Sequence, residues 1–494
     1  MYSKGTPTLS KSRFLSGLQC PLRLWFECYA PVLAGESSLA QKARMEIGQD
    51  VGRLATELYP GGELIEEDHV HHEDAVRTTN ATMTFSDVPA IFQAAFLHDD
   101  IRIRTDILEK FDRNRWNLIE VKSGVKVKAD YLYDLGIQYY VLKGSGLDIN
   151  QTCIMHLNGD YVYNGFQLDV RDFFHFQDLT DHVVSIQSKI PSELSKQKEI
   201  LARPEPPHMI PSLSCKPSNN CEFRTHCAKD LPDYPVIELP GLTQAKWDAL
   251  AELGTLSIRD IPDSFPLSEL QQRVRTCVIT EEEHVDMTLQ TELTDIEFPI
   301  HFLDFETMGP TIPYYAGTSP YQTIPFQWSD HILFKDGSLE PRHFLWDERT
   351  DPREEFIRSL LETLGQVSTI FIYTDYEKNI LKGLSEQFPD YHGPLLATLD
   401  RMKDLCAIVR THYYHPKFHG SFSLKSVLPV LVPDMRYDDL AIQEGEQASL
   451  EYMRMIEPST PSEEKKKIRL NLISYCGQDT LAMVKIREEL LGRA

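Results

Sequence analysis

The sequence has no run of about 18 apolar residues, so we expect no transmembrane helix and no membrane partner. Residues 1–12 lack the apolar stretch of a secretory signal. Cysteine is sparse, with nine in 494 residues, which excludes a small disulfide scaffold and favours reduced thiols in a cytoplasmic protein. No internal repeat and no extended low-complexity segment is present, so a repeat architecture is excluded.

Positive charge is also scarce, because 50 Lys and Arg residues face 74 Asp and Glu residues and leave a net charge of −24. Such a charge opposes a long nucleic-acid footprint. It does not exclude a nuclease, since bound metal ions offset acidic ligands. One stretch is locally basic and contains Arg102, Arg104, Lys110, Arg113, Arg115, Lys122, Lys126 and Lys128.

The length predicts two or three domains. Residues 1–60 have helical patterns, whereas residues 85–123 alternate like strands. A helix is predicted over residues 131–142, and a hairpin over residues 153–163 around Asn158-Gly159-Asp160. Beyond residue 295 strands and helices alternate, which predicts an α/β multidomain protein.

Two acidic residues lie two apart on a predicted buried strand, Asp304 and Glu306, and therefore point to the same face. Tyr475 and Asp479 lie four apart at the predicted start of the last helix and share one side of it. Between these segments, either Asp375 or Glu377 follows another predicted strand. Hard oxygen ligands of this kind suit Mg²⁺ or Mn²⁺.

This order of residues resembles the DnaQ-like DEDD exonucleases of the RNase H-like fold over residues 296–494. The resemblance implies that Asp304, Glu306, Glu377 and Asp479 hold two metal ions and that Tyr475 orients the attacking water. The family usually has Asp where this chain has Glu377, and Asp375 competes for the role. Residues expected to contact the substrate are Tyr321, His415 and Lys425.

A second set of acids occurs near the N-terminus. Asp106 lies on one predicted strand, and Glu120 and Lys122 share a face of the next. Asp106, Glu120 and the carbonyl of Val121 can hold a metal ion, while Lys122 orients a water. Gln138 and Tyr140 follow on a helix.

These residues resemble the RecB-like nucleases of the PD-(D/E)XK superfamily over residues 1–230. The resemblance implies a restriction-endonuclease-like core in which Gln138 and Tyr140 face the substrate. Many relatives add a His ligand from the first helices; here Glu46 or Glu57 would have to replace it.

Three cysteines, Cys215, Cys221 and Cys227, have five residues between successive members, and Cys20 lies far upstream. Four thiolates suit zinc or a 4Fe–4S cluster. The pattern resembles the iron–sulfur subset of RecB-like nucleases, although Cys28 could replace Cys20. Structural thiols without metal are the alternative.

The whole chain resembles a family of predicted nucleases in which a RecB-like domain is fused to a DEDD exonuclease, here through a helix-hairpin-helix-like connector over residues 231–295. The resemblance implies metal-dependent hydrolysis of DNA, single-stranded or with a 3′ end, in repair, CRISPR-associated processing or defence. An RNA exonuclease and a nucleic-acid-binding scaffold with decayed sites are the alternatives.

Overall fold

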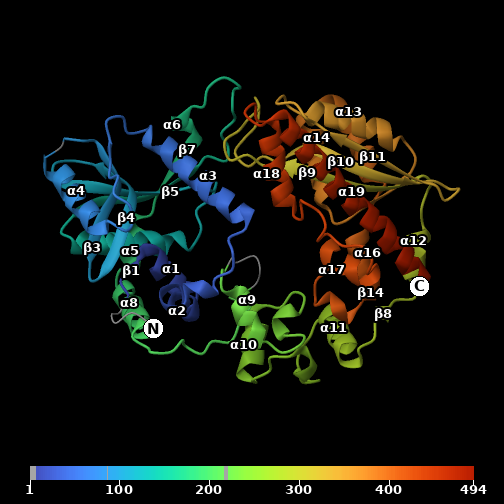
Figure 1. Ribbon diagram of the computed structural model, residues 1–494, viewed down its shortest axis with the longest axis horizontal. Helices are drawn as coiled ribbons and strands as arrows, with labels where there is room; N and C mark the ends of the chain where they lie inside the picture. The colour runs from blue at the N-terminus through green and yellow to red at the C-terminus, as the bar shows by residue number, and fades with distance from the viewer. Residues whose placement is uncertain (1–6, 86, 216–220, 494) are drawn as a thin grey trace. The chain divides into compact units, whose positions relative to one another are not determined.

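Two separate β-sheets organise the chain in the computed structural model, which describes residues 7–85, 87–215 and 221–493 (Figure 1). Two parts of the sequence predictions lie outside the described residues. These are residues 1–6, where no signal sequence was expected, and residues 216–220, between Cys215 and Cys221. The expected α/β multidomain class is confirmed. One unit comprises Met1–Lys229 with Thr311–Tyr321, and the other Asp230–Pro310 with Gln322–Ala494. Within the described ranges, no helix combines the length and apolar character needed to cross a bilayer.

The sheet of the N-terminal unit has seven strands in the order β2-β3-β4-β5-β6-β7, and β1 pairs with β4. Its strands are β1 Leu9–Ser10, β2 Glu63–Leu64, β3 Ala90–His98, β4 Ile101–Lys110, β5 Arg115–Lys122, β6 Asp148–Leu157 and β7 Phe174–Asp178. The helices are α1 Lys11–Gln19, α2 Pro21–Tyr29, α3 Leu39–Thr56, α4 His72–Phe85, α5 Tyr131–Gly144, α6 Val170–Phe173, α7 Thr180–Ile186, α8 Ile190–Leu201 and α9 Arg224–Cys227.

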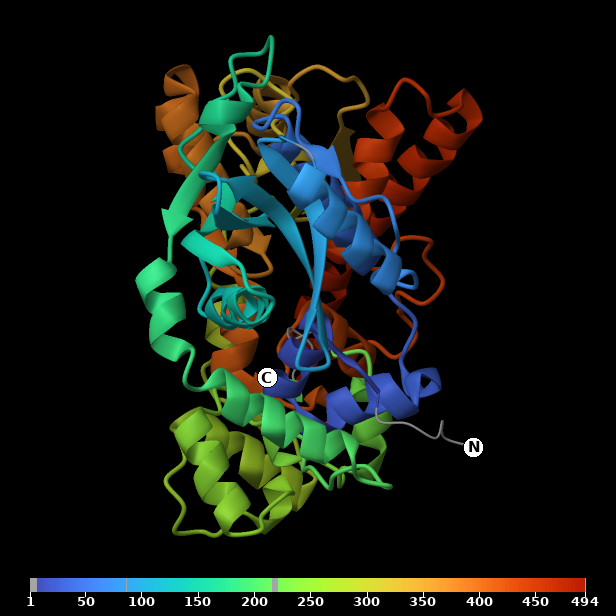
Figure 2. The same cartoon turned by 90° about the vertical axis from the view of Figure 1, so that its left-hand side faces the viewer.

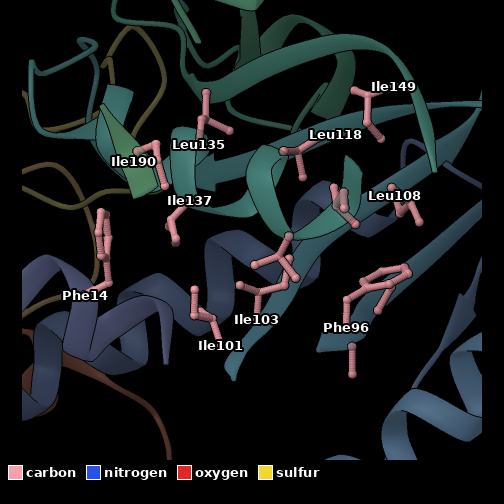
Figure 3. Close-up of a cluster of buried hydrophobic side chains, with 14 of the residues drawn as sticks. Phe14, Phe96, Ile101, Ile103, Leu108, Leu118, Leu135, Ile137, Ile149 and Ile190 are labelled. Atoms are coloured by element: carbon pink, nitrogen blue, oxygen red, sulfur yellow. The ribbon is translucent and has the colours of Figure 1, made fainter. Parts of the chain in front are cut away.

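Apolar side chains cover both faces of this sheet. Helix α5 lies against one face of the sheet (Figure 2). There Leu118 of β5 packs in a core with Leu135 and Ile137 of α5 and Phe14 of α1 (Figure 3). On the other face, Val51 of α3 belongs to a second core. A carboxylate on a central strand of such a sheet is therefore enclosed from both sides.

The predicted hairpin over residues 153–163 is wrong. Strand β6 ends at Leu157 and pairs instead with β7, which begins at Phe174. The Asn158 side chain accepts the Asp160 amide and closes a local turn. The backbone of Tyr163 then bonds to residues 317 and 318, so it does not return along β6.

The sheet of the C-terminal unit has five strands in the order β11-β10-β9-β12-β13, and β9 pairs antiparallel with β10 and parallel with β12. Its strands are β9 Ile300–Met308, β10 Ile324–Leu333, β11 Leu339–Leu345, β12 Thr369–Ile372 and β13 Met402–Asp404, and a separate pair joins β8 His284–Val285 to β14 Tyr413–Tyr414. The helices are α10 Gln244–Glu252, α11 Glu269–Thr280, α12 Leu289–Thr294, α13 Arg353–Leu364, α14 Tyr376–Gln387, α15 His392–Leu399, α16 Leu405–His412, α17 Leu424–Leu431, α18 Gly445–Ile456 and α19 Ser462–Arg493.

Helices α13 and α14 bury the apolar face of β9 that carries Leu303 and Phe305. Helix α19 contacts β9 and β10. It begins at Ser462, so the prediction that Tyr475–Asp479 open the last helix is wrong. The first turns, rich in Glu and Lys, conceal its start, and its buried side begins only at Ile468. Tyr475 and Asp479 consequently lie in the middle of a long helix.

Candidate functional site

Four carboxylates of the C-terminal unit, from three distant segments, act on one another. Asp304 and Glu306 lie on β9, Glu377 lies in the first turn of α14 after β12, and Asp479 lies on α19. Glu306, Glu377 and Asp479 are buried, and Asp304 is partly buried. Because the three segments are distant in sequence, only the tertiary fold brings all four acids together.

Burial and repulsion by neighbouring acids make Asp304, Glu306 and Glu377 hold their protons at neutral pH. The pKa of Asp304 is raised well above its usual range by burial and then by Asp479, Glu306 and Glu377. Burial and Asp479 likewise raise the pKa of Glu306. Burial, with Asp404 and Asp479, raises the pKa of Glu377 to about 8. Ionising all four at neutral pH therefore requires additional positive charge.

The nearest cation is Lys425, whose ammonium lies over the rings of Tyr475 and Tyr437, 5.4 and 5.5 Å from their centroids. Its Nζ is 3.4 Å from the hydroxyl of Tyr475. Tyr437 donates a hydrogen bond to Asp479. Burial raises the pKa of Asp479 to about 6, and the Tyr437 bond and the charge of Lys425 oppose this increase.

The residues fit a divalent cation. Ligand atoms of Asp304, Glu306 and Cys476 lie within 4.8 Å of one another, and in the described part of the chain no other such group of three was found. Oε2 of Glu377 is buried without a hydrogen-bond partner, as expected of an oxygen that binds a metal ion. The sequence patterns assigned no role to Cys476, but its Sγ donates to Oδ2 of Asp304 at 3.3 Å.

The structure also distinguishes the two candidates for the third acid. Asp375 precedes α14, is exposed and pairs with Lys378 at 3.0 Å. Glu377 points inward instead. A further acid, Asp404 at the end of β13, accepts the Thr374 amide at 3.2 Å and raises the pKa of Glu377. Its place at the end of a strand was the sequence signal that could have identified it.

Two residues expected at the rim of this site have other surroundings. Tyr321 belongs to the N-terminal unit, where its hydroxyl donates to the carbonyl of Ser123 at 2.9 Å. His415 accepts the amide of Lys417 at 3.1 Å, and among the described contacts none joins it to the four acids. Of the three predicted substrate contacts, only Lys425 lies beside the acids.

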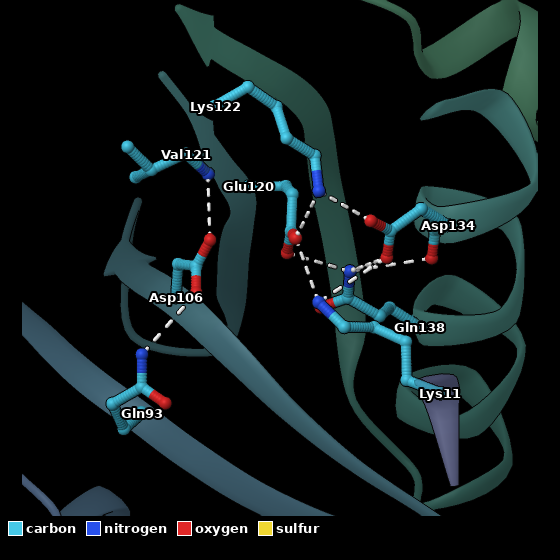
Figure 4. Close-up of polar contacts among 8 residues, drawn as sticks. All are labelled: Lys11, Gln93, Asp106, Glu120, Val121, Lys122, Asp134 and Gln138. Atoms are coloured by element: carbon cyan, nitrogen blue, oxygen red, sulfur yellow. Dashed lines mark hydrogen bonds and ion pairs between the residues drawn. The ribbon is translucent and has the colours of Figure 1, made fainter. Parts of the chain in front are cut away.

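The second candidate site lies on β4, β5 and α5 of the N-terminal unit (Figure 4). Glu120 is buried and accepts three bonds, from Lys11 at 2.7 Å and from Lys122 and Gln138 at 2.8 Å each. Asp134 is held by Lys122 at 2.6 Å and by Lys11 at 3.3 Å. Two ammonium groups thus face two carboxylates.

Asp106 stands apart from this network. Its Oδ2 accepts the Val121 amide at 2.9 Å, and its Oδ1 accepts from Gln93 at 3.3 Å (Figure 4). Burial and then the charge of Glu120 raise the pKa of Asp106 to about 6. For Glu120 burial acts in the same direction, but Lys11 and Lys122 outweigh it and lower the pKa below the usual range.

Lys11, which sequence reasoning missed, therefore lies against a carboxylate where a metal ion was expected. Gln138 is buried and supports Glu120, whereas Tyr140 donates to Asp99 at 3.3 Å. Glu46 and Glu57, the proposed replacements for a His ligand, are exposed. The carboxylates of this site are balanced by lysines, and those of the C-terminal site are not.

The cysteines gather loosely around α1, α2 and α9. Cys20 separates α1 from α2, and Cys28 lies in α2. Cys221 and Cys227 pack beside Phe223. Burial raises the pKa of Cys221, to which the neighbouring Cys20 contributes. Among the described residues, no three thiols lie within 4.8 Å of one another, so no three are placed as the ligands of a single zinc ion would be.

A family model described as a domain of unknown function (DUF2779) matches residues 301–423. The matched segment contains Asp304, Glu306 and Glu377 and ends before Tyr475 and Asp479. No curated protein matches the chain.

Proposed function

We propose that the chain is a nuclease that hydrolyses phosphodiester bonds of DNA at its C-terminal carboxylates, as the resemblance to DEDD exonucleases implies. The observation that carries the proposal is the meeting of Asp304, Glu306, Glu377 and Asp479 in one buried group. These four would hold Mg²⁺ or Mn²⁺. When bound, such ions activate a water and stabilise the leaving oxygen.

Tyr475 and Lys425 supply the remaining functions. Burial and the charges of Asp479 and Glu306 raise the pKa of the Tyr475 hydroxyl, so it stays protonated and can donate a hydrogen bond to a water. Lys425, beside that hydroxyl, supplies positive charge for a phosphate oxygen. We propose that nucleotides are removed from the 3′ end, as the resemblance to DEDD exonucleases implies.

The N-terminal unit is proposed as a RecB-like domain of PD-(D/E)XK type, with Asp106, Glu120 and Lys122 as its site. Lys11 would have to leave Glu120 before a metal ion could reach that carboxylate, because the ammonium lies 2.7 Å from Oε1. For the N-terminal unit alone, this contact favours a second candidate function, in which the unit binds nucleic acid without cleaving it.

The experiment uses a single-stranded DNA labelled at its 5′ end, with a matched RNA, in Mg²⁺ or Mn²⁺. Asp304→Asn should lose at least about 100-fold in rate, because one ligand of the metal ions is gone. Asp375→Asn removes an exposed carboxylate nearby and should cleave like wild type. If wild type and Asp304→Asn cleave at equal rates, the assignment of the C-terminal carboxylates as the active site is refuted. If RNA is cleaved faster than DNA, the substrate is RNA.

For the cysteines we propose a 4Fe–4S cluster, with zinc as the alternative, held by Cys20, Cys215, Cys221 and Cys227. The support is the resemblance and the nearness of Cys20 to Cys221. Iron and zinc analysis of the purified protein tests it, together with the melting temperature of Cys221→Ser. A protein free of both metals, with unchanged melting in the variant, contradicts the proposal.

A further inference from the structure

A cavity of about 700 Å³ in the N-terminal unit is lined by an unusual excess of positive charge. Arg13 of α1 and Arg102 and Arg104 of β4 line it together with Lys11, whereas Asp106 is its one acidic lining residue. In a chain with a net charge of −24, this local reversal of sign needs an explanation. We name this cavity, with its three arginines, the arginine pocket.

The three arginines of this cavity form no ion pair with any residue that the structure describes. No carboxylate oxygen of the described residues lies within 4.0 Å of Arg13, Arg102 or Arg104, the range in which other ion pairs of this chain occur. Nε of Arg102 is buried without any hydrogen-bond partner. Leaving a buried cationic group without a partner costs free energy, so an anion that binds here would remove that cost.

Arg104 is held in position by the main chain. Its guanidinium donates to the carbonyl oxygens of Gln93 at 3.2 Å, of Ile65 at 2.9 Å and of Glu67. Carbonyl groups fix its orientation but leave its positive charge in place. Burial lowers the pKa of Arg104 and outweighs the charges of Glu67 and Asp68, which act to raise it. Neither carboxylate is paired with the guanidinium, because Glu67 accepts from Thr78 and Asp68 accepts from His71.

Arg13 is likewise bonded to a carbonyl group, that of Thr8, at 3.0 Å. Its helix begins beside Arg102, because Ser10 of β1 pairs with Arg102 of β4 and also caps α1. The strand pairing therefore brings Arg13 and Arg102 to the same cavity although 88 positions separate them.

The chemistry of the lining identifies the class of ligand. Planar guanidinium groups match the oxygens of phosphate better than any other cationic side chain. Tyr, Trp and Phe are absent from the lining residues of this cavity, and its aromatic rings are those of His69 and His72. Because four of its lining side chains are Lys or Arg, we expect a ligand to be held here mainly by its phosphates.

We propose that the arginine pocket binds the phosphate backbone of a nucleic-acid strand, without a metal ion and without regard to sequence. The choice of nucleic acid over free phosphate rests on the proposed function. The pocket shares Asp106 with the N-terminal site, so a strand held here passes beside that carboxylate.

The test measures binding in EDTA by fluorescence anisotropy of a labelled single-stranded 20-nucleotide DNA, with every variant made in an Asp304→Asn background. Arg102→Gln should weaken binding about 5- to 10-fold and reduce the salt dependence by about one released ion. Arg13→Gln should act similarly. Arg102→Lys keeps the charge and should recover most of the affinity. Arg113→Gln removes an exposed arginine of the same basic stretch and should change affinity less than 2-fold.

Unchanged binding by both Arg102→Gln and Arg13→Gln, or an equal loss in Arg113→Gln, overturns the proposal. Inorganic phosphate is the second arm: if it raises the melting temperature of wild type but not of Arg102→Gln, while DNA binding is the same in both, the ligand is free phosphate and the nucleic-acid assignment fails. If wild type cleaves DNA but Arg102→Gln binds DNA normally, this inference is wrong and the proposed nuclease activity stands. If wild type does not cleave but DNA binding depends on the arginines, the proposed nuclease activity is wrong and this inference stands.

Discussion

Asp479→Asn should stabilise the metal-free protein at neutral pH, although the substitution removes a residue of the candidate site. The pKa of Asp479 in the folded chain is about 6, against an ordinary value of 3.8. A folded-state pKa above the unfolded one means that stability is fully present below about pH 4 and is lost as pH rises through 6. Ionised Asp479 thus opposes folding at pH 7.5.

The size of the effect follows from this difference. The difference between a pKa of about 6 and one of 3.8 corresponds to about 3 kcal/mol at pH 7.5 and about 1 kcal/mol at pH 4.5. For a unit of this size, about 3 kcal/mol raises the melting temperature by roughly 6–12 °C. Asparagine keeps an oxygen that can accept the bond from Tyr437, so the hydrogen bond is retained while the charge is lost.

The assay is calorimetric melting of the full chain in EDTA at both pH values, with Asp375→Asn as the matched control. Asp375 is exposed and already paired with Lys378, so its substitution should change the melting temperature little at either pH. Adding Mn²⁺ should stabilise wild type more than Asp479→Asn. If Asp479→Asn melts no higher than wild type at pH 7.5, or gains as much at pH 4.5, the reasoning from the burial of an ionised Asp479 is wrong.

Three further outcomes are expected. Tyr475→Phe should lower cleavage about 100-fold and leave Mn²⁺ binding by calorimetry unchanged, because the hydroxyl acts on water and not on metal. Cys476→Ser should weaken Cd²⁺ binding at least about 10-fold relative to Mn²⁺ in the same titration, since a soft ligand 3.3 Å from Asp304 is lost. Lys11→Met should cost about 3 kcal/mol in urea unfolding because buried carboxylates lose a partner, whereas exposed Lys42→Met should not.

Local patterns were sufficient to select part of the C-terminal site. The alternation of a strand places Asp304 and Glu306 on one face, and the helical period does the same for Tyr475 and Asp479. The choice between Asp375 and Glu377 could not be made in this way. It depends on the rotation at which α14 begins, which buries the second acid and exposes the first.

Contacts between distant segments were beyond reach of the sequence. Lys11 meets Glu120 across 109 positions, and no local period marks it. Tyr321 was expected to contact the substrate of the C-terminal acids because it lies in an aromatic segment, residues 313–321, of the predicted exonuclease domain. The segment that contains it belongs instead to the N-terminal unit, so proximity in sequence was misleading.

The two carboxylate sites differ in how their charge is balanced, and this difference separates their dependence on metal. At the N-terminal site, Lys11 and Lys122 each lie within 3 Å of Glu120, whose pKa they lower. At the C-terminal site one lysine, Lys425, faces four acids whose pKa values are all raised. A divalent cation adds favourable charge at the second site but must displace an ammonium at the first. Removal of metal should therefore loosen the C-terminal unit and leave the N-terminal network intact. Nucleic-acid binding by the arginine pocket should persist in EDTA, whereas the proposed cleavage at the C-terminal carboxylates should not.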